Sequence, residues 1–145
     1  MATIKSYTDL GQSKKLAEIL PVESADMEYG YIAPYEFSDR MFEGGYDDVP
    51  YPKDFLKRNP NFSEDEYDGS FPCWSLAALR SLLPSSIEFN GKTYLFDSYK
   101  TSDGIWAYQY AALNESTLFY FKSIHDVDAC YEMIICLHEQ NCLGL

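Results

Sequence analysis

Three side chains in this sequence are of types that act as nucleophiles or bases in enzymes, namely Cys73, Ser75 and His138. Cys73 stands in SFPCWSL (70–76), where a proline and the following apolar spacing predict the start of a helix over about 72–83. A thiolate in the first turn of a helix is stabilised by the helix dipole, so Cys73 is a candidate nucleophile with His125 as its base. The acidic run SEDEYDG just before it disfavours the thiolate, which weighs against catalysis.

Ser75 and His138 form a second candidate pair. On a helical wheel of about 100° per residue, each lies near the middle of the apolar arc of its own predicted helix. If those helices pack side by side, the two polar side chains are expected to hydrogen-bond with each other. The pair is either a Ser-His dyad or a satisfied polar contact in the core. No GxSxG motif or recognisable acid accompanies it, which favours the core contact.

Metal and cofactor sites are not expected. His138 and Cys142 share a helical face, but a metal site needs three or four ligands, and His125 lies at the other end of that helix. The four cysteines contain no CxxC pair, and the sequence has no EF-hand loop, glycine-rich phosphate loop or dinucleotide fingerprint. Whether the chain is an enzyme stays open, with the balance against it.

The clearest structural signal is SSIEFNGKTYLF (85–96), where Asn90-Gly91 separates two β-prone runs. A two-residue turn pairs Phe89 with Lys92 and Ile87 with Tyr94, which gives the hairpin one core face and one mixed face. Two further strands are predicted in GIWAYQYAAL (104–113) and STLFYFKS (116–123), followed by a helix in HDVDACYEMIICLHEQNCL (125–143).

Upstream, the patterns predict a helix over about 13–20, a short extended piece over 27–31 and a long irregular aromatic and acidic segment over 32–69. Trp74 lies on the side of its predicted helix that faces away from the core, and we expect this aromatic segment to cover it. The chain is therefore predicted to be a single α+β domain, 1–145. Its core is an antiparallel four-stranded meander with two or three helices packed on one face.

The net charge of −12, from 23 acidic and 11 basic side chains, limits the classes of molecule that the chain is expected to bind. Such a chain repels phosphate backbones and anionic membrane surfaces, so direct binding to nucleic acid or membrane is disfavoured. No run of about 18 apolar residues is present, and the N-terminus lacks the apolar core of a signal peptide, so the expected location is cytoplasmic.

The first functional hypothesis is a non-enzymatic interaction protein that binds a protein partner, with a basic partner favoured by charge. The candidate binding residues are aromatic and acidic side chains of the long segment: Tyr35, Phe37, Tyr46, Asp47, Asp48 and Tyr51. Three alternatives stay open. They are a DNA-mimicking inhibitor of a defence system, a small hydrolase that uses Cys73 or Ser75 with His138, and a homo-oligomer formed through exposed tyrosines.

Three stretches carry a resemblance, namely PCWSLAALRSLLP, AEILPVESADMEY and DACYEMIICLHE. In these the chain resembles uncharacterised small acidic proteins of Bacteroides-type bacteria and their phages or mobile elements. The resemblance covers both ends and the central helix. It implies a gut-bacterial or phage origin and an accessory role, and it carries no catalytic residues over to this chain.

Overall fold

The structure is a computed structural model. It describes residues 4–32, 35–37, 40–42, 44–53, 70–113 and 117–144, without the side chains of 32, 35–37 and 40–42. The chain divides into two compact units. Unit 1 combines Met1–Thr8 with Ser75–Leu145, and unit 2 is Asp9–Trp74. Each unit is described by itself below.

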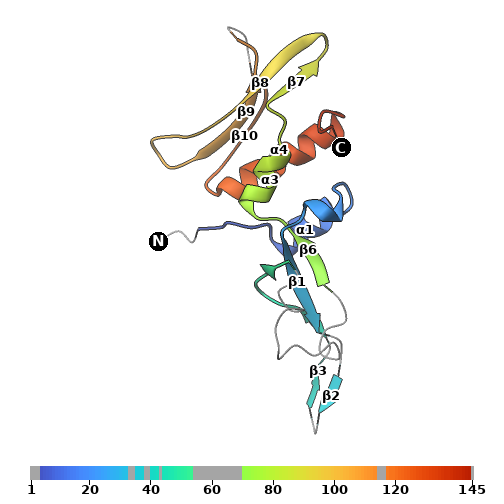
Figure 1. Cartoon of the computed structure of the whole chain (residues 1–145). Helices are drawn as coiled ribbons and strands as arrows, with labels where there is room; N and C mark the ends of the chain where they lie inside the picture. The colour runs from blue at the N-terminus through green and yellow to red at the C-terminus, as the bar shows by residue number, and fades with distance from the viewer. Residues whose placement is uncertain are drawn as a thin grey trace. The chain divides into compact units, whose positions relative to one another are not determined.

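Unit 1 is built on a four-stranded antiparallel sheet in the order β10-β9-β8-β7 (Figure 1). Its strands are β7 (Ser86–Phe89), β8 (Lys92–Lys100), β9 (Trp106–Ala111) and β10 (Thr117–Ser123). Every strand pairs with its neighbour in the sequence, so the sheet is a meander. This confirms the predicted meander and the α+β class.

The turn between β7 and β8 has the backbone that its sequence predicts. Asn90 and Gly91 have φ angles of 52° and 80°, and both residues of this hairpin turn type need positive φ. Ile87 pairs with Tyr94 and Phe89 with Lys92, which confirms the predicted register. Ile87 and Tyr94 are buried, so their face of the sheet is the core face.

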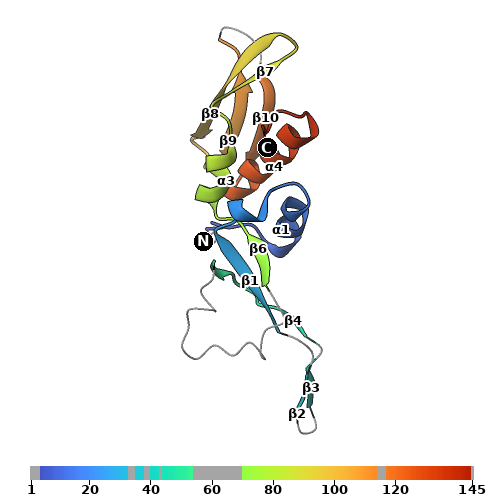
Figure 2. The ribbon, with the colours of Figure 1, turned by 45° about the vertical axis from the view of Figure 1, so that its right-hand side comes forward.

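Two helices cover that core face. The helix α4 (Asp126–Glu139) packs on β9 and β10, and α3 (Leu76–Leu82) packs against α4, as Figures 1 and 2 show. The core between them consists of apolar and aromatic side chains without solvent exposure: Leu79, Tyr108, Tyr110, Val127, Cys130, Met133, Ile134 and Leu137. This α-helical layer on one face of the sheet is the arrangement predicted for the two later helices.

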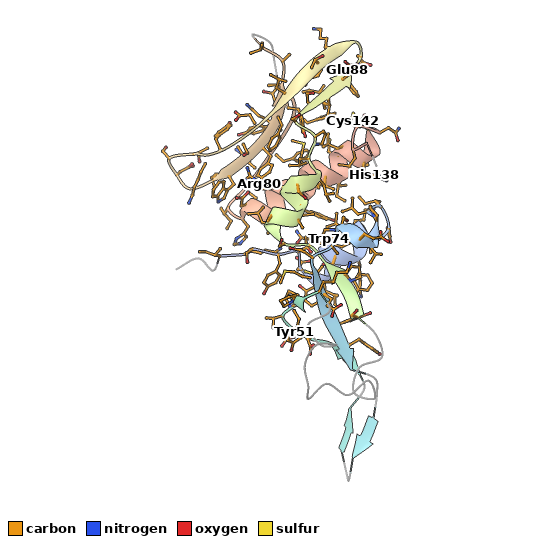
Figure 3. The ribbon with its side chains drawn as sticks, in the orientation of Figure 1. Tyr51, Trp74, Arg80, Glu88, His138 and Cys142 are labelled. Carbon is orange, nitrogen blue, oxygen red and sulfur yellow. The ribbon has the colours of Figure 1, made fainter. Side chains whose placement is uncertain are left out.

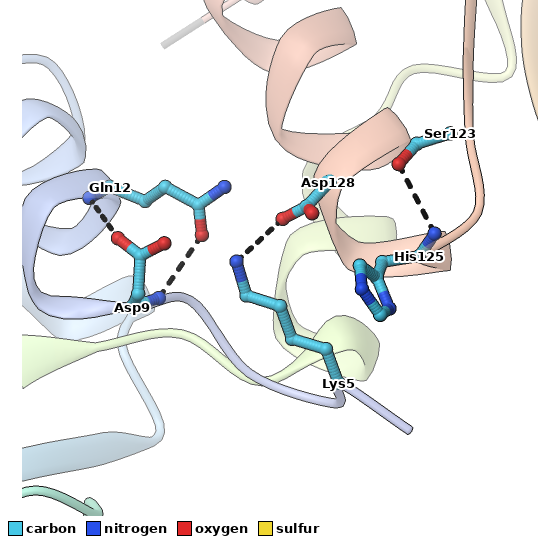
Figure 4. A network of polar contacts seen from close by, with 6 residues as sticks. All are labelled: Lys5, Asp9, Gln12, Ser123, His125 and Asp128. Carbon is cyan, nitrogen blue, oxygen red and sulfur yellow. Dashed lines mark hydrogen bonds and ion pairs between the residues drawn. The ribbon is translucent and has the colours of Figure 1, made fainter. Parts of the chain in front are cut away.

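The N-terminal segment belongs to unit 1. Tyr7 forms an isolated antiparallel bridge with Ser75, and the amide of Leu76 donates to the Ser6 carbonyl at 2.9 Å. Lys5 forms an ion pair of 2.7 Å with Asp128 in the first turn of α4 (Figure 4). These contacts fix residues 5–7 beside the starts of both helices.

Unit 2 is organised around strand β1 (Met27–Ile32), which pairs with β4 (Gly45–Tyr46), β5 (Tyr51–Pro52) and β6 (Ser70–Cys73). The helix α1 (Leu10–Ala17) packs on β6, and the 3-10 helix η1 (Val22–Ser24) follows it. A separate two-stranded sheet joins β2 (Tyr35–Phe37) to β3 (Arg40–Phe42). The extended piece predicted over 27–31 is confirmed.

Three sequence expectations need correction here. The helix predicted over 72–83 begins only at Leu76, because Pro72 and Cys73 belong to β6. The recorded pairing of β6 is with β1 alone, and such an edge strand tolerates a proline that lacks an N–H. The segment 32–69 is not irregular throughout, since it holds β2 to β5. Its part from 54 to 69 lies outside the described residues.

The predicted start of the first helix is also displaced. The helix was expected from about residue 13, but α1 begins at Leu10. Asp9 accepts the Gln12 amide at 2.8 Å, and the Gln12 side chain accepts the Asp9 amide at 3.0 Å (Figure 4). This capping box satisfies two backbone donors and outweighs the cost of Gly11 in the first turn.

Trp74 is the last residue of unit 2. Its side chain has no solvent exposure, and its indole Nε1 donates to the Ser24 hydroxyl at 2.9 Å. That hydroxyl donates in turn to the Pro21 carbonyl at 2.6 Å. Trp74 is covered, as expected. Its recorded hydrogen-bond partner comes from η1, upstream of the aromatic segment that was expected to cover it.

None of the helices in the described parts of the chain has the length and apolar character needed to span a bilayer.

Candidate functional site

Cys73 is not at a helix N-terminus. It lies in β6 and has no solvent-exposed surface. The dipole of α3, which starts three residues later, therefore does not act on it in the predicted way. A thiol without exposed surface is out of reach of a substrate in this structure, and it packs as a small apolar side chain.

Ser75 and His138 are not brought together. Ser75 is the N-cap of α3, and its hydroxyl accepts the Ala78 amide at 3.1 Å. Leu76 and Asp126 line one cleft, so Ser75 lies near the start of α4. His138 lies twelve residues beyond Asp126 on α4, or about 18 Å along the helix axis. His138 is also exposed, so its expected place in the middle of a buried face is wrong (Figure 3).

Among the described residues, no group of three or more histidine, cysteine, aspartate or glutamate side chains is placed to hold a metal ion. Cys142 is half-buried and donates to the Gln140 carbonyl at 3.4 Å.

The proposed partner-binding residues of unit 2 lie in different settings. The Tyr46 ring packs against Tyr31 at 4.9 Å and Phe71 at 5.9 Å between centroids, with the Lys14 ammonium over it at 5.8 Å. This ring therefore takes part in the internal packing of the unit.

The other proposed partner-binding residues differ in their burial. Asp47 is half-buried, and its Oδ2 atom is buried without a hydrogen-bond partner among the described residues. Burial, and then the charge of Asp48, raise the pKa of Asp47. Asp48 is exposed, and Tyr51 is half-buried in β5. The side chains of Tyr35 and Phe37 lie outside the described set.

A polar network inside unit 1 connects α3, β8, β9 and α4. Arg80 donates to the Tyr108 hydroxyl at 3.1 Å and to the Ser98 hydroxyl at 3.0 Å. The Tyr108 hydroxyl donates to Asp126, whose second oxygen lies 3.8 Å from the Arg80 guanidinium. Burial, and then the bond to Asp126, raise the pKa of Tyr108, so its phenol remains a proton donor at neutral pH.

Cys130 lies beside this network. Burial raises the pKa of the Cys130 thiol to about 12, and the negative charge of Asp126 acts in the same direction. The thiol therefore stays protonated at neutral pH and is not a nucleophile. The network holds the two helices on the sheet, and it positions the carboxylate of Asp126, the first residue of α4.

Next to Asp126 a cleft of about 620 Å³ opens within unit 1. Its apolar lining comes from Ile4, Leu76, Trp106 and Ile124, and its polar lining includes Lys5, Lys100, His125 and Asp126. Lys100 is the last residue of β8 and Trp106 the first of β9, so this end of the strand pair lines the cleft. Lys100 pairs with Trp106 at the last register position of the two strands, where both side chains remain partly exposed.

The cations of this cleft differ in their partners. Lys5 is paired with Asp128, whereas Lys100 lies 5.2 Å from the centroid of the Trp106 ring and has no ion pair among the described residues. His125 is the N-cap residue of α4, but its side chain does not cap the helix. Its amide donates to the Ser123 hydroxyl at 3.1 Å (Figure 4), and His125 lines the same cleft as Lys5.

The opposite face of the same sheet carries exposed apolar side chains. The strand register places Leu95, Tyr99 and Tyr120 on this outer face, with exposed fractions of 45, 40 and 43%. Ala107 and Ala111 of β9 lie between them on the same face. The proximity of the Tyr120 hydroxyl raises the pKa of Tyr99, and Gln109 of β9 lies opposite Tyr120 on this face.

Sequence reasoning missed the cleft as a site. The cleft joins residues near positions 5, 76, 100 and 125, which no local pattern connects. The outer face corresponds in part to the exposed tyrosines that the sequence suggested as a surface for self-association. Leu95 belongs to the mixed face of the predicted hairpin, and the neighbouring strands are rich in tyrosine.

Comparison with family models, with curated proteins and with solved structures found no match to this chain.

Proposed function

We propose that this chain is a non-enzymatic binding protein that holds a protein partner on the outer face of the unit 1 sheet. The observation that carries the proposal is the exposure of Leu95, Tyr99 and Tyr120 together on one sheet face, away from the helices. Soluble domains expose single apolar residues routinely, but several on one sheet face, here arranged around the hydrogen-bonded Asp97 and Gln109, are typical of a binding surface.

The two tyrosines suit such a surface energetically. Tyrosine gives a large contact area and a polar tip with few rotatable bonds, and it is enriched among residues that dominate binding energy. Each tyrosine side chain has few rotatable bonds, so little side-chain entropy is lost when it is held by a partner.

An aliphatic hollow extends the surface. It has a volume of about 390 Å³ and is lined by Leu95, Leu113 and Ala112 together with Lys92 and Thr93. Leu113 is 80% exposed. A partner with one apolar side chain can fill this hollow while a flatter part of its surface lies on the tyrosines.

Charge favours a basic partner over a second copy of the chain. Glu88, Asp97 and Lys122 lie on the described part of the outer face, Lys92 lines the adjoining hollow, and the whole chain carries a net charge of −12. Two copies would repel each other, whereas a basic protein would be attracted from a distance. The resemblance to small acidic proteins of Bacteroides-type bacteria and phages supports an accessory role in the cytoplasm of such a host.

The alternatives receive less support. A hydrolase that uses Cys73 would need access to a thiol that has no exposed surface, and Ser75 caps a helix instead of meeting His138. A DNA mimic would need regularly spaced carboxylates on one face, whereas on the outer face of the sheet Glu88 and Asp97 share β7 and β8 with the exposed Leu95 and Tyr99.

Site-specific photo-cross-linking tests the proposal. A benzophenone amino acid replaces Tyr120 on the outer face or, as a control, Val49, which is 54% exposed in unit 2. In cells of the organism that encodes the chain, we expect one protein adduct from position 120 and none of that mass from position 49.

The partner identified in this way is then purified for calorimetry. Combined Tyr99→Ser and Tyr120→Ser substitutions should weaken its binding by about 100-fold, as expected for two binding-energy residues. Val49→Ser should leave the affinity unchanged. Equal adducts from both positions, an adduct of twice the chain mass, or an affinity insensitive to the tyrosines would each overturn the proposal.

A further inference from the structure

We infer that the cleft of unit 1 binds a small amphipathic anion, an apolar or aromatic body that carries one carboxylate. This site lies on the helix side of the sheet and is separate from the outer face, so the inference does not depend on the proposed protein partner. It rests on the shape of the cleft, its apolar lining and the arrangement of its charges.

Size and lining fit a small organic molecule. The volume of about 620 Å³ lies within the usual range for ligand pockets. Trp106 forms an aromatic wall, and Leu76 and Ile124 add aliphatic surface. Ligand sites commonly combine such an apolar lining with a few convergent polar groups.

The charges select an anion. Of the acids at the cleft, Asp126 binds Tyr108 and lies 3.8 Å from the Arg80 guanidinium, whereas Asp103 accepts the Thr101 hydroxyl and keeps its negative charge. Lys100 has no carboxylate partner in the described parts of the chain, and it lies over the Trp106 ring. A ligand carboxylate beside Lys100 would therefore complete an ion pair at the aromatic wall.

His125 can supply a second donor. Its imidazole lines the cleft and makes no recorded hydrogen bond in the described structure, because only its main-chain amide is used, toward Ser123. An imidazole N–H and an ammonium that converge on one carboxylate give charge-assisted hydrogen bonds, which are stronger than neutral ones.

The walls of the cleft are held in place without a ligand. The Lys5–Asp128 ion pair and the Leu76–Ser6 hydrogen bond fix the N-terminal segment, and Thr101 orders the β8–β9 turn by accepting the Ile105 amide at 3.0 Å. A site formed in advance binds with less entropy loss.

The two tryptophans of the chain provide the test. In a ¹⁵N-labelled sample the indole signal of Trp106 reports on the cleft, and that of Trp74, buried in unit 2, is an internal control. The probes are N-acetylphenylalanine, its neutral amide and 3-phenylpropanoate. We expect both carboxylates to shift the Trp106 signal, with dissociation constants on the order of 1 mM for probes of this size.

The neutral amide should bind about tenfold more weakly than N-acetylphenylalanine, because it cannot pair with Lys100. Tighter binding of N-acetylphenylalanine than of 3-phenylpropanoate would identify a peptide C-terminus as the source of the carboxylate. Equal binding of the two would identify a free small acid.

Lys100→Met keeps the length of the side chain and removes its charge. We expect about tenfold weaker binding of N-acetylphenylalanine by this variant. Lys122→Met, the same change on the outer face of the sheet, is the matched control and should bind as the unsubstituted chain does. Equal shifts from acid and amide, equal effects of the two substitutions, or shifts of Trp74 as large as those of Trp106 would overturn the inference.

Discussion

The sheets of the two units solve the same packing problem differently. In unit 1, strands of up to nine residues pair with their neighbours in the sequence and bury one face under α3 and α4. In unit 2, partners of two to four residues gather around β1. Their polar contacts differ too. Unit 1 has a charged network in which Asp126 is largely buried and the Arg80 side chain is 40% exposed, and unit 2 has a neutral bond from the buried Trp74 indole to Ser24. Both units pack aromatic rings, so the sheets differ in strand length and in the charge of their polar contacts.

The largest predicted loss in the free energy of unfolding comes from a substitution in the charged network of unit 1. Tyr108→Phe removes the hydroxyl that donates to Asp126 and accepts from Arg80, and it should lower the free energy of unfolding of unit 1 by about 2 kcal/mol. Urea unfolding followed at Trp106 measures this.

Tyr110→Phe is the matched control for that substitution. Tyr110 is equally buried on the same strand, but its hydroxyl donates at 2.6 Å to the neutral Pro84 carbonyl, so the expected loss is about 1 kcal/mol. Equal losses in the free energy of unfolding for the two substitutions would show that the charges of the network do not strengthen the Tyr108 hydrogen bonds.

The sequence predicted unit 1 far better than unit 2, for a physical reason. Asn90-Gly91 and the alternation around it specify a turn, a register and a core face within a dozen residues. In unit 2, β1 pairs with residues far along the chain, and strands as short as Gly45–Tyr46 are too brief to show any period. Pro72 resembled the first residue of a helix because an edge-strand proline has the same local signature.

A smaller effect is expected from the neutral bond of unit 2. Ser24→Ala leaves the buried Trp74 indole N–H without its acceptor, and this should lower the free energy of unfolding of unit 2 by about 1 kcal/mol. The fluorescence of Trp74 on urea unfolding reports it. Ser81→Ala is the control, because the exposed Ser81 hydroxyl only donates to the Ala78 carbonyl within α3. If the two substitutions lower the free energy of unfolding equally, the buried indole hydrogen bond stabilises unit 2 no more than an exposed hydroxyl bond does.

The smallest predicted effect is a gain in the free energy of unfolding, and it comes from removing the charge of Asp47. Because burial and Asp48 raise the pKa of Asp47, its ionised form is less stable in the folded state than in the unfolded one. The resulting cost is present above the folded pKa and disappears as the pH falls below the usual aspartate value of about 4.

Asp47→Asn should therefore raise the free energy of unfolding at pH 7 by a few tenths of a kcal/mol, about the scale of a partly solvated group. Urea titrations at pH 7 and pH 3 check this, and the gain should vanish at pH 3. A gain that is the same at both pH values would mean that the carboxylate charge is not its cause.

The candidate sites were less predictable than the fold. Lys5, Lys100 and His125 meet only because the N-terminal segment, a strand end and a helix start converge, and no spacing in the sequence encodes that. His138 misled in the opposite way. The wheel drew the buried arc of α4 too wide. The arc is centred near Leu137, and His138 lies at its edge on the side of the half-buried Tyr131 and Ile135, where it is exposed.

The pairing of β1 with β6 has a consequence for the length of the intervening segment. Met27 pairs with Cys73, so the strand pair closes a loop of 46 positions (73 minus 27). The entropy lost in closing a loop grows only with the logarithm of its length, and doubling the length costs about 0.6 kcal/mol. Bringing β1 and β6 together over this separation therefore costs only slightly more entropy than joining strands half as far apart in the sequence.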